Sequence, residues 1–83
     1  MNIKQTISKA GQNYHTIILT ARKQDGTIDT REVEPYSYKF ANGHELFFCY
    51  DVNKRGMRSF IVSNIISVEK TNNSFTPKYN VEV

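Results

Sequence analysis

Three short turn sequences divide the middle of the chain into segments that lie next to one another. Asp25-Gly26 and Asn42-Gly43 are hairpin signals, because glycine adopts positive φ without steric cost. Asn53-Lys54-Arg55-Gly56 supplies a third turn. Strands that are joined by tight turns run antiparallel, so the sequence predicts a series of β-hairpins.

The segments between these turns are rich in β-branched and aromatic residues, which suit strands. The predicted strands cover residues 14–22, 28–33, 45–52, 57–62 and 65–70, with an extended continuation at 36–40. The run at 45–52 is the most apolar and is predicted to be the central strand. Pro35 has no amide hydrogen, so it predicts an interruption, a bulge or an edge position.

Residues 2–11 have the apolar spacing of a short helix, with Asn2 as the predicted N-cap and Gly11 as the predicted C-terminal stop. Such a helix is marginal alone, so we expect it to dock on the end of a barrel. Strands this short and numerous usually close into a barrel, which removes exposed edges. The sequence therefore predicts an antiparallel barrel at about residues 14–71 and a tail at 72–83.

Length, charge and cysteine content limit the class of protein. A chain of 83 residues is enough for one domain with one core. The formal net charge of +3 permits an anionic partner but does not require one. Cys49 is the only cysteine, so no internal disulfide forms and a reducing compartment fits. No apolar stretch is typical of a signal peptide or a membrane span, so we expect a cytoplasmic protein.

The motifs of common enzyme classes are absent. The sequence has no Gly-rich phosphate loop, no His-Glu-x-x-His and no paired cysteines for zinc. His15, His44 and Cys49 lie on different predicted elements, so a Cys–His pair would need a coincidence of folding. We therefore do not expect the chain to be an enzyme or to use a metal or a cofactor.

Three arginines lie on predicted strands or at their ends: Arg22, Arg31 and Arg58. A guanidinium group binds phosphate through two parallel hydrogen bonds, and a strand holds it more rigidly than a loop does. The functional hypothesis is that the three converge on one face and hold an anionic ligand. The alternative is that each pairs with a nearby carboxylate, such as Asp29 or Glu32.

Three aromatic residues alternate in the segment after Pro35. Tyr36, Tyr38 and Phe40 share one face if this segment is extended. Aromatic rings on such a face can stack on nucleic-acid bases. Phe40 is predicted to be core, and Tyr36 and Tyr38 are candidate stacking residues. The alternative is that both tyrosines cover the core.

A series of positions resembles the WYL family in order and spacing. The matching residues are Arg31, Val33, Glu34, Pro35, Gly43, Tyr50, Asp51, Arg58, Phe60 and Ile65. The resemblance covers about residues 14–75. The chain departs from the family at Glu45-Leu46-Phe47, where the name-giving Trp-Tyr-Leu stands, and at Ile61 and Asn64, where basic residues are common.

The resemblance implies a five-stranded Sm-like or SH3-like barrel and a regulatory sensor of nucleotides or nucleic acids, usually found in bacterial transcription factors. We therefore predict one stand-alone WYL-like domain over residues 1–83, which binds single-stranded nucleic acid or a nucleotide-type anion. The predicted binding residues are Arg22, Arg31, Tyr36, Tyr38 and Arg58. The alternative is a protein-interaction or homo-oligomerisation module of a regulatory or mobile-element system.

Overall fold

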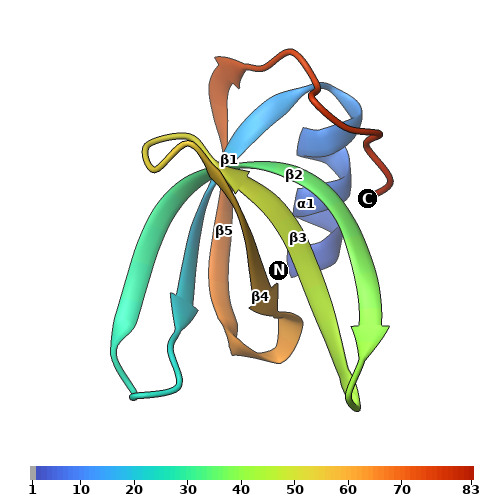
Figure 1. The fold of residues 1–83 in the computed structure, drawn as a ribbon. Coiled ribbons are helices and arrows are strands. Elements are labelled where there is room, and N and C mark those ends of the chain that lie inside the picture. Colours follow the sequence, from blue (N-terminus) through green and yellow to red (C-terminus); the bar gives the residue numbers. More distant parts are fainter. Residues whose placement is uncertain (1) are drawn as a thin grey trace.

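The computed structural model describes residues 2–83 and shows a mainly β fold with one helix at the N-terminus (Figure 1). The elements are α1 (Ile3–Gln12), β1 (His15–Arg22), β2 (Ile28–Ala41), β3 (His44–Asp51), β4 (Gly56–Ile61), the 3-10 helix η1 (Val62–Asn64) and β5 (Ile65–Ser74). All strand pairs are antiparallel and form one sheet in the order β4-β3-β2-β1-β5. The predicted fold class, a five-stranded antiparallel sheet with a short helix, is confirmed at this level.

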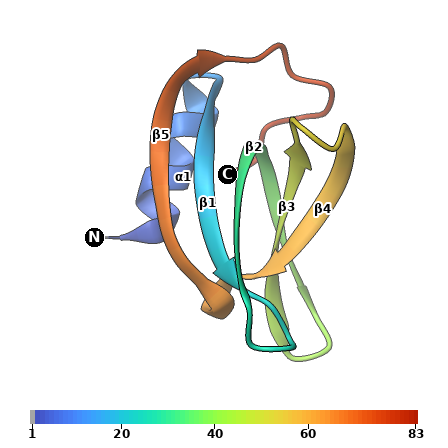
Figure 2. The ribbon, with the colours of Figure 1, turned by 90° about the vertical axis from the view of Figure 1, so that its left-hand side faces the viewer.

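The sheet is not closed, so the predicted barrel is not confirmed. Its two edges are β4 and β5, and no backbone pairing joins them in residues 2–83. Figure 2 shows β1 and β5 on one side, β3 and β4 on the other, and β2 passing between them. The central strand is β2, so the expectation that residues 45–52 are central is wrong. Because β2 has 14 residues, it pairs with β1 near its start and with β3 near its end.

The turn and bulge predictions agree with the backbone. Gly26 (φ 89°), Asn42 (φ 53°) and Gly43 (φ 79°) all have the positive φ that tight hairpin turns require. The register of β2 against β3 shifts between Pro35 and Ser37, which makes a bulge with Tyr36 as the extra residue. Proline cannot donate to the ladder, and the bulge accommodates it inside a central strand.

The helix has the predicted N-cap and ends one residue later than predicted. The side chain of Asn2 accepts a hydrogen bond from the Gln5 amide at 3.1 Å, which is an N-cap. The helix ends at Gln12, and Tyr14 takes the left-handed conformation (φ 57°) that reverses the chain. Gly11 is therefore not the stop. It is a buried residue of the last turn.

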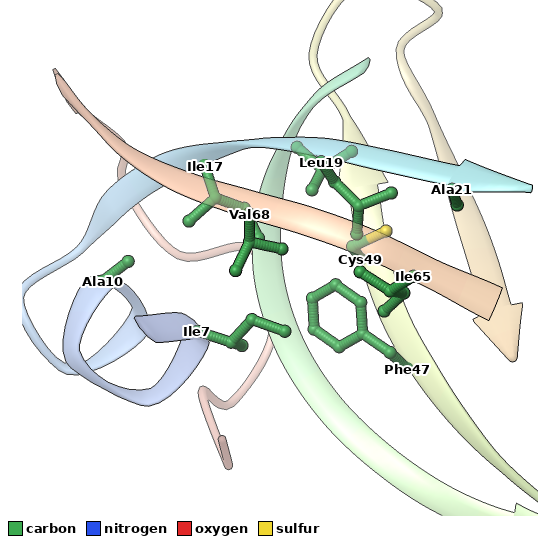
Figure 3. Packing of buried hydrophobic residues seen from close by; sticks show 10 residues of the cluster. Ile7, Ala10, Ile17, Leu19, Ala21, Phe47, Cys49, Ile65 and Val68 are labelled. Carbon is green, nitrogen blue, oxygen red and sulfur yellow. The ribbon is translucent and has the colours of Figure 1, made fainter. Parts of the chain in front are cut away.

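One core lies between the sheet and α1, which packs on β5, β1 and β2. Figure 3 shows Ile7 of the helix pointing towards Phe47 and Val68. The core cluster consists of Ile7, Ala10, Ile17, Leu19, Ala21, Val33, Phe47, Cys49, Ile65 and Val68. The apolar face of β3 that points inward is thus the one that carries Phe47 and Cys49.

The tail after β5 returns across the helix without forming a strand. Strand β5 extends to Ser74, beyond the predicted boundary at residue 71. The Glu82 amide donates to the Tyr36 carbonyl oxygen at 2.6 Å, and Val83 packs against the core. Gly11 makes this path possible, because a Cβ at this position would overlap the Val83 side chain and approach Val81 to 3.2 Å.

Replacing Gly11 with alanine is expected to loosen the tail while leaving the global free energy of unfolding almost unchanged. Alanine gains about 1 kcal/mol of helix propensity over glycine, which offsets the lost contacts of Val83. Hydrogen exchange of the Glu82 amide should therefore accelerate, while amides in β1 keep their protection. Unchanged exchange at Glu82 would contradict this role for Gly11.

Candidate anion-binding cleft

The three predicted arginines line one cleft of about 720 Å³ between the β1–β2 hairpin and β4. Figure 2 shows the C-terminal end of β4 running towards the C-terminal end of β1, and residues of both ends line the cleft. Its lining consists of Ala21, Arg22, Lys23, Gln24, Asp25, Asp29, Arg31, Leu46, Met57, Arg58, Ser59, Phe60, Ile61 and Asn64. The cleft thus combines cationic, acidic and apolar side chains.

Asp51 organises the cleft from below, although sequence reasoning did not single it out as a site residue. It is the last residue of β3, and only 1% of it is exposed. Its Oδ2 accepts hydrogen bonds from Arg31 Nη1 at 2.7 Å and Arg58 Nε at 3.1 Å. Its Oδ1 accepts from the backbone amides of Asn53 (3.0 Å) and Lys54 (2.9 Å). One buried carboxylate therefore ties together β2, β4 and the β3–β4 turn.

The strand register explains why Arg31 and Arg58 meet at this carboxylate. Asp51 is opposite Val33 of β2, and Cys49 is opposite Arg58 of β4. Val33, Cys49 and Asp51 are buried on the inner side of the sheet. Side chains two residues apart on a strand share a face, so Arg31 joins Val33 and reaches Asp51 across the bend of β2.

The two arginines differ in how much of each guanidinium group is already engaged. Arg31 is 15% exposed at its side chain, and it also donates Nε to Asp29 Oδ2 at 2.7 Å. Arg58 is 38% exposed, and within residues 2–83 its Nη1 and Nη2 have no hydrogen-bond partner. Arg58 is thus held in place through its Nε, while its two terminal nitrogens are available to donate hydrogen bonds to a ligand in the cleft.

The pKa values of Asp51, Asp29 and Arg31 are all shifted in the direction that favours the charged form. Burial alone would raise the pKa of Asp51, but the hydrogen bonds from Lys54 N–H, Arg31 and Asn53 N–H outweigh it and lower the pKa. Burial also opposes ionisation of Asp29, whose pKa is lowered by the hydrogen bond and the charge of Arg31. The hydrogen bond to Asp51 raises the pKa of Arg31. All three groups are therefore charged near neutral pH.

The remaining charged residues of the cleft lie on its rim. Lys23 is half-exposed, with its Nζ 3.7 Å from Asp29 Oδ2. Arg22 is exposed and has no ion-pair partner in the described part of the chain. Asp25 accepts hydrogen bonds from the amide and hydroxyl of Thr27, which stabilise the hairpin turn. The charged side chains of the rim are thus more exposed and less paired than Arg31 and Asp51.

The two predicted stacking residues, Tyr36 and Tyr38, lie outside this cleft. Tyr36 is 2% exposed, and its ring packs edge to face on Phe75 (5.8 Å) and Tyr79 (5.4 Å). Tyr38 packs on Phe47 at 5.6 Å. The alternation that should have placed them together is broken because Tyr36 is the extra residue of the bulge. Phe40, predicted as core, is instead 72% exposed near the β2–β3 turn.

Tyr36, predicted to stack on bases, instead forms a polar network with Glu34 and Lys78. The Tyr36 hydroxyl donates to Glu34 Oε1 at 2.6 Å and accepts from the Lys78 amide at 3.0 Å. Lys78 Nζ is 3.0 Å from both Glu34 carboxylate oxygens and 4.2 Å from the Tyr50 ring centroid. Burial, followed by this hydrogen bond to Glu34, raises the pKa of Tyr36. The tyrosine therefore holds the tail and offers no free ring face.

The histidines and the cysteine do not form a cluster. His15 Nδ1 is hydrogen-bonded to the Thr71 carbonyl oxygen at 3.0 Å, and His44 is exposed at the β2–β3 turn. Cys49 is fully buried, and burial raises its pKa to about 12, so its thiol is not activated. Among residues 2–83, no group of three or more His, Cys, Asp or Glu side chains is arranged to hold a metal. Within the same residues, no helix is long and apolar enough to cross a membrane.

Acidification is expected to destabilise the fold through Asp51 and Asp29. Both have pKa values below the ordinary value of 3.8 in the folded state, so the unfolded chain binds protons more readily. Their stabilisation is fully present above about pH 4 and is lost as the pH falls through their folded pKa values. Urea unfolding at about pH 7 and about pH 3 should show a smaller loss in Asp51→Asn than in the native chain. An equal loss in both would contradict the assignment.

The comparisons with known proteins support the fold and leave the family undecided. No protein-family model matches this chain, and no curated protein matches it. The solved structure of Proteasome accessory factor B/C (PafBC) of Arthrobacter aurescens is similar, with a TM-score of 0.76 and 18% sequence identity. The match covers 94% of this chain and only 13% of that chain. At this identity the likeness is one of fold, and membership of the WYL family stays a prediction.

Proposed function

We propose that this chain is a non-catalytic ligand-binding module of a regulatory system, and that its cleft binds a phosphate-bearing anion of the nucleotide or nucleic-acid type. The observation that carries the proposal is the convergence of Arg31 and Arg58 on the single carboxylate of Asp51, at the floor of a cleft that Arg22 also lines. Guanidinium groups fixed in this way are well suited to bidentate binding of phosphate.

The pairing with Asp51 orients the arginines more than it neutralises them. One carboxylate is shared by two guanidinium groups, and its four hydrogen bonds use all its acceptor positions. The outer nitrogens of Arg58 have no partner in residues 2–83. Holding a donor in place before binding reduces the entropy that is lost when a ligand arrives.

The regulatory role is supported by resemblance rather than by the site itself. The sequence resembles WYL domains, for which a sensor function is expected. The fold is similar to a small part of Proteasome accessory factor B/C, which suits a module that works beside other domains. The buried thiol of Cys49 is not available as a nucleophile, because burial raises its pKa to about 12.

Titration with single-stranded DNA, single-stranded RNA and nucleotides, followed by amide chemical shifts, tests the proposal. We expect shifts centred on Arg22, Arg31 and Arg58, and affinity that falls as salt rises. Arg58→Ala should lose most of the binding, whereas Arg55→Ala should keep it, because Arg55 is exposed in the β3–β4 turn outside the cleft. Diffuse shifts, or equal losses in the two variants, would reject this site.

A protein-interaction role remains the second candidate, because β4 is an unpaired edge and Met57 on it is 44% exposed. Exposed edges can accept a strand from another chain. Phe47 is fully buried within one chain, so a dimer would have to form through other residues. Sedimentation analysis decides whether copies associate, and a concentration-independent monomer removes the homo-oligomer alternative.

A further inference from the structure

We infer that the cleft takes a compact ligand, with a single phosphate group on Arg58 and a flat or apolar body beside Met57 and Phe60, and does not bind a nucleic-acid strand along its backbone. This inference rests on the proposed function and narrows its ligand class. It follows from the charge, the donors and the lining of the cleft.

The charge balance limits how many phosphates the cleft can hold. Four cations line it, Arg22, Lys23, Arg31 and Arg58, together with the acidic Asp25 and Asp29. Asp51, which is paired with Arg31 and Arg58, adds a third carboxylate. One positive charge is therefore in excess over the whole cleft. Proteins that bind single strands along their backbone use a positively charged groove that follows successive phosphates. One excess positive charge is too few for such a groove.

The hydrogen-bond donors point to one phosphate position. Arg31 uses Nε on Asp29 and Nη1 on Asp51, so most of its fork is directed at protein carboxylates. Arg58 uses only Nε, which leaves both terminal nitrogens without partners in residues 2–83. Arg58 is thus the ligand-contacting arginine, and Arg31 and Asp51 are positioning residues.

The lining supplies an apolar surface next to that position. Leu46, Met57, Phe60 and Ile61 line the cleft together with Arg58. Met57 is 44% exposed, and Phe60 is partly buried against the core. The volume of about 720 Å³ is within the usual range for sites of small molecules. A nucleoside base or a similar flat group could therefore cover the exposed side chain while its phosphate reaches Arg58.

Calorimetric titration of the full chain tests this ligand class with four probes: adenosine monophosphate, adenosine, inorganic phosphate and a single-stranded DNA of about 12 nucleotides. We expect adenosine monophosphate to bind at least about tenfold more tightly than adenosine or phosphate, because it uses both parts of the cleft. The slope of log K against log salt, which for a nucleic-acid strand reports the number of phosphates contacted, should be shallow for the monophosphate, because a small ion has no condensed counterions to release.

The affinity for the single-stranded DNA separates this inference from the proposed function. If the DNA binds about a hundredfold more tightly than the monophosphate, with a slope steeper than about −3, the compact-ligand inference is wrong while the proposed function stands. If none of the phosphate-bearing probes binds, the proposed function itself is wrong. An affinity for the DNA within a few-fold of the monophosphate supports the inference.

Two variants test the division of roles between Arg58 and Asp51. Arg58→Lys keeps the charge but removes the fork, and we expect about a tenfold loss of adenosine monophosphate binding. Asp51→Asn makes the cleft more positive, so charge alone predicts tighter binding, whereas positioning predicts weaker binding. Weaker binding by a variant that keeps the native circular dichroism supports the inference, and tighter binding overturns the positioning role. Arg58→Lys keeps the test decisive if the Asn variant fails to fold.

Discussion

Replacing Asp51 with alanine is expected to lower the free energy of unfolding by about 3 kcal/mol, because removing one partner of a buried ion pair leaves the other charges uncompensated. The change deletes four hydrogen bonds at once. It leaves the Arg31 guanidinium in a site where its side chain is only 15% exposed. We place the effect at the lower end for buried pairs because Arg58 is partly exposed and regains solvation. Urea unfolding near neutral pH measures the change.

Glu69→Ala is the matched control for this variant. Glu69 is an exposed carboxylate on β5 with no ion-pair partner within residues 2–83, so its removal should change the stability by less than about 0.5 kcal/mol. If the two variants unfold at the same urea concentration, Asp51 does not link β2, β4 and the turn as described. A large effect of Asp51 alone would establish it as a structural requirement of the cleft.

The parts of the fold that depend on local sequence were predictable. Asn42-Gly43 and Gly26 take the positive φ that their turns require, and Asn2 caps the helix. Pro35 gives the expected bulge. Each feature is determined by a few neighbouring residues, so the sequence contains the needed information. Closure of the sheet is different, because it depends on how far a strand such as β2 bends, and the described strands leave the edges unpaired.

The site was predictable only in part, for a related reason. Arg31 and Arg58 could be selected from residue type and strand position, but their meeting point is Asp51, which a third strand supplies. A signal for Asp51 was present, since an aspartate two residues before the turn Asn53-Lys54-Arg55-Gly56 is well placed to accept hydrogen bonds from the turn amides. Tyr36 and Tyr38 lie outside the cleft, because the bulge puts Tyr36 out of the alternation and the tail then buries it.

The hydrogen bonds of Asp51 to Arg31, Arg58 and the turn amides also show why stability and recognition are coupled in this cleft. The hydrogen bonds that fix Arg58 for a ligand are the same ones that hold β4 to the turn and to β2. A ligand that binds Arg58 should therefore stabilise the folded state by mass action, without any change of fold. A variant that removes the hydrogen bonds of Asp51 should lose both stability and affinity, whereas a variant of a rim residue such as Arg22 should lose affinity alone. This difference separates Asp51 from Arg22.

Replacing Phe47 with alanine is expected to have the largest effect of any single core substitution, a loss of about 4 kcal/mol in the free energy of unfolding. Phe47 is fully buried, and its ring packs on Tyr38 and lies beside Ile7 and Ile65 (Figure 3). A domain of this length has a total stability of about 4 to 12 kcal/mol, so the variant should be partly unfolded at room temperature. Urea unfolding at low temperature, followed by circular dichroism, measures the loss.

Phe40→Ala is the matched control, because it removes the same side chain from a position that is 72% exposed. We expect a change below about 0.5 kcal/mol there. Equal losses at the two positions would mean that the inner face of β3 has been assigned wrongly. The Phe47 ring is fully buried within a single chain, where the helix, β2 and β5 cover it. This burial argues for a much larger loss of stability in Phe47→Ala than in Phe40→Ala.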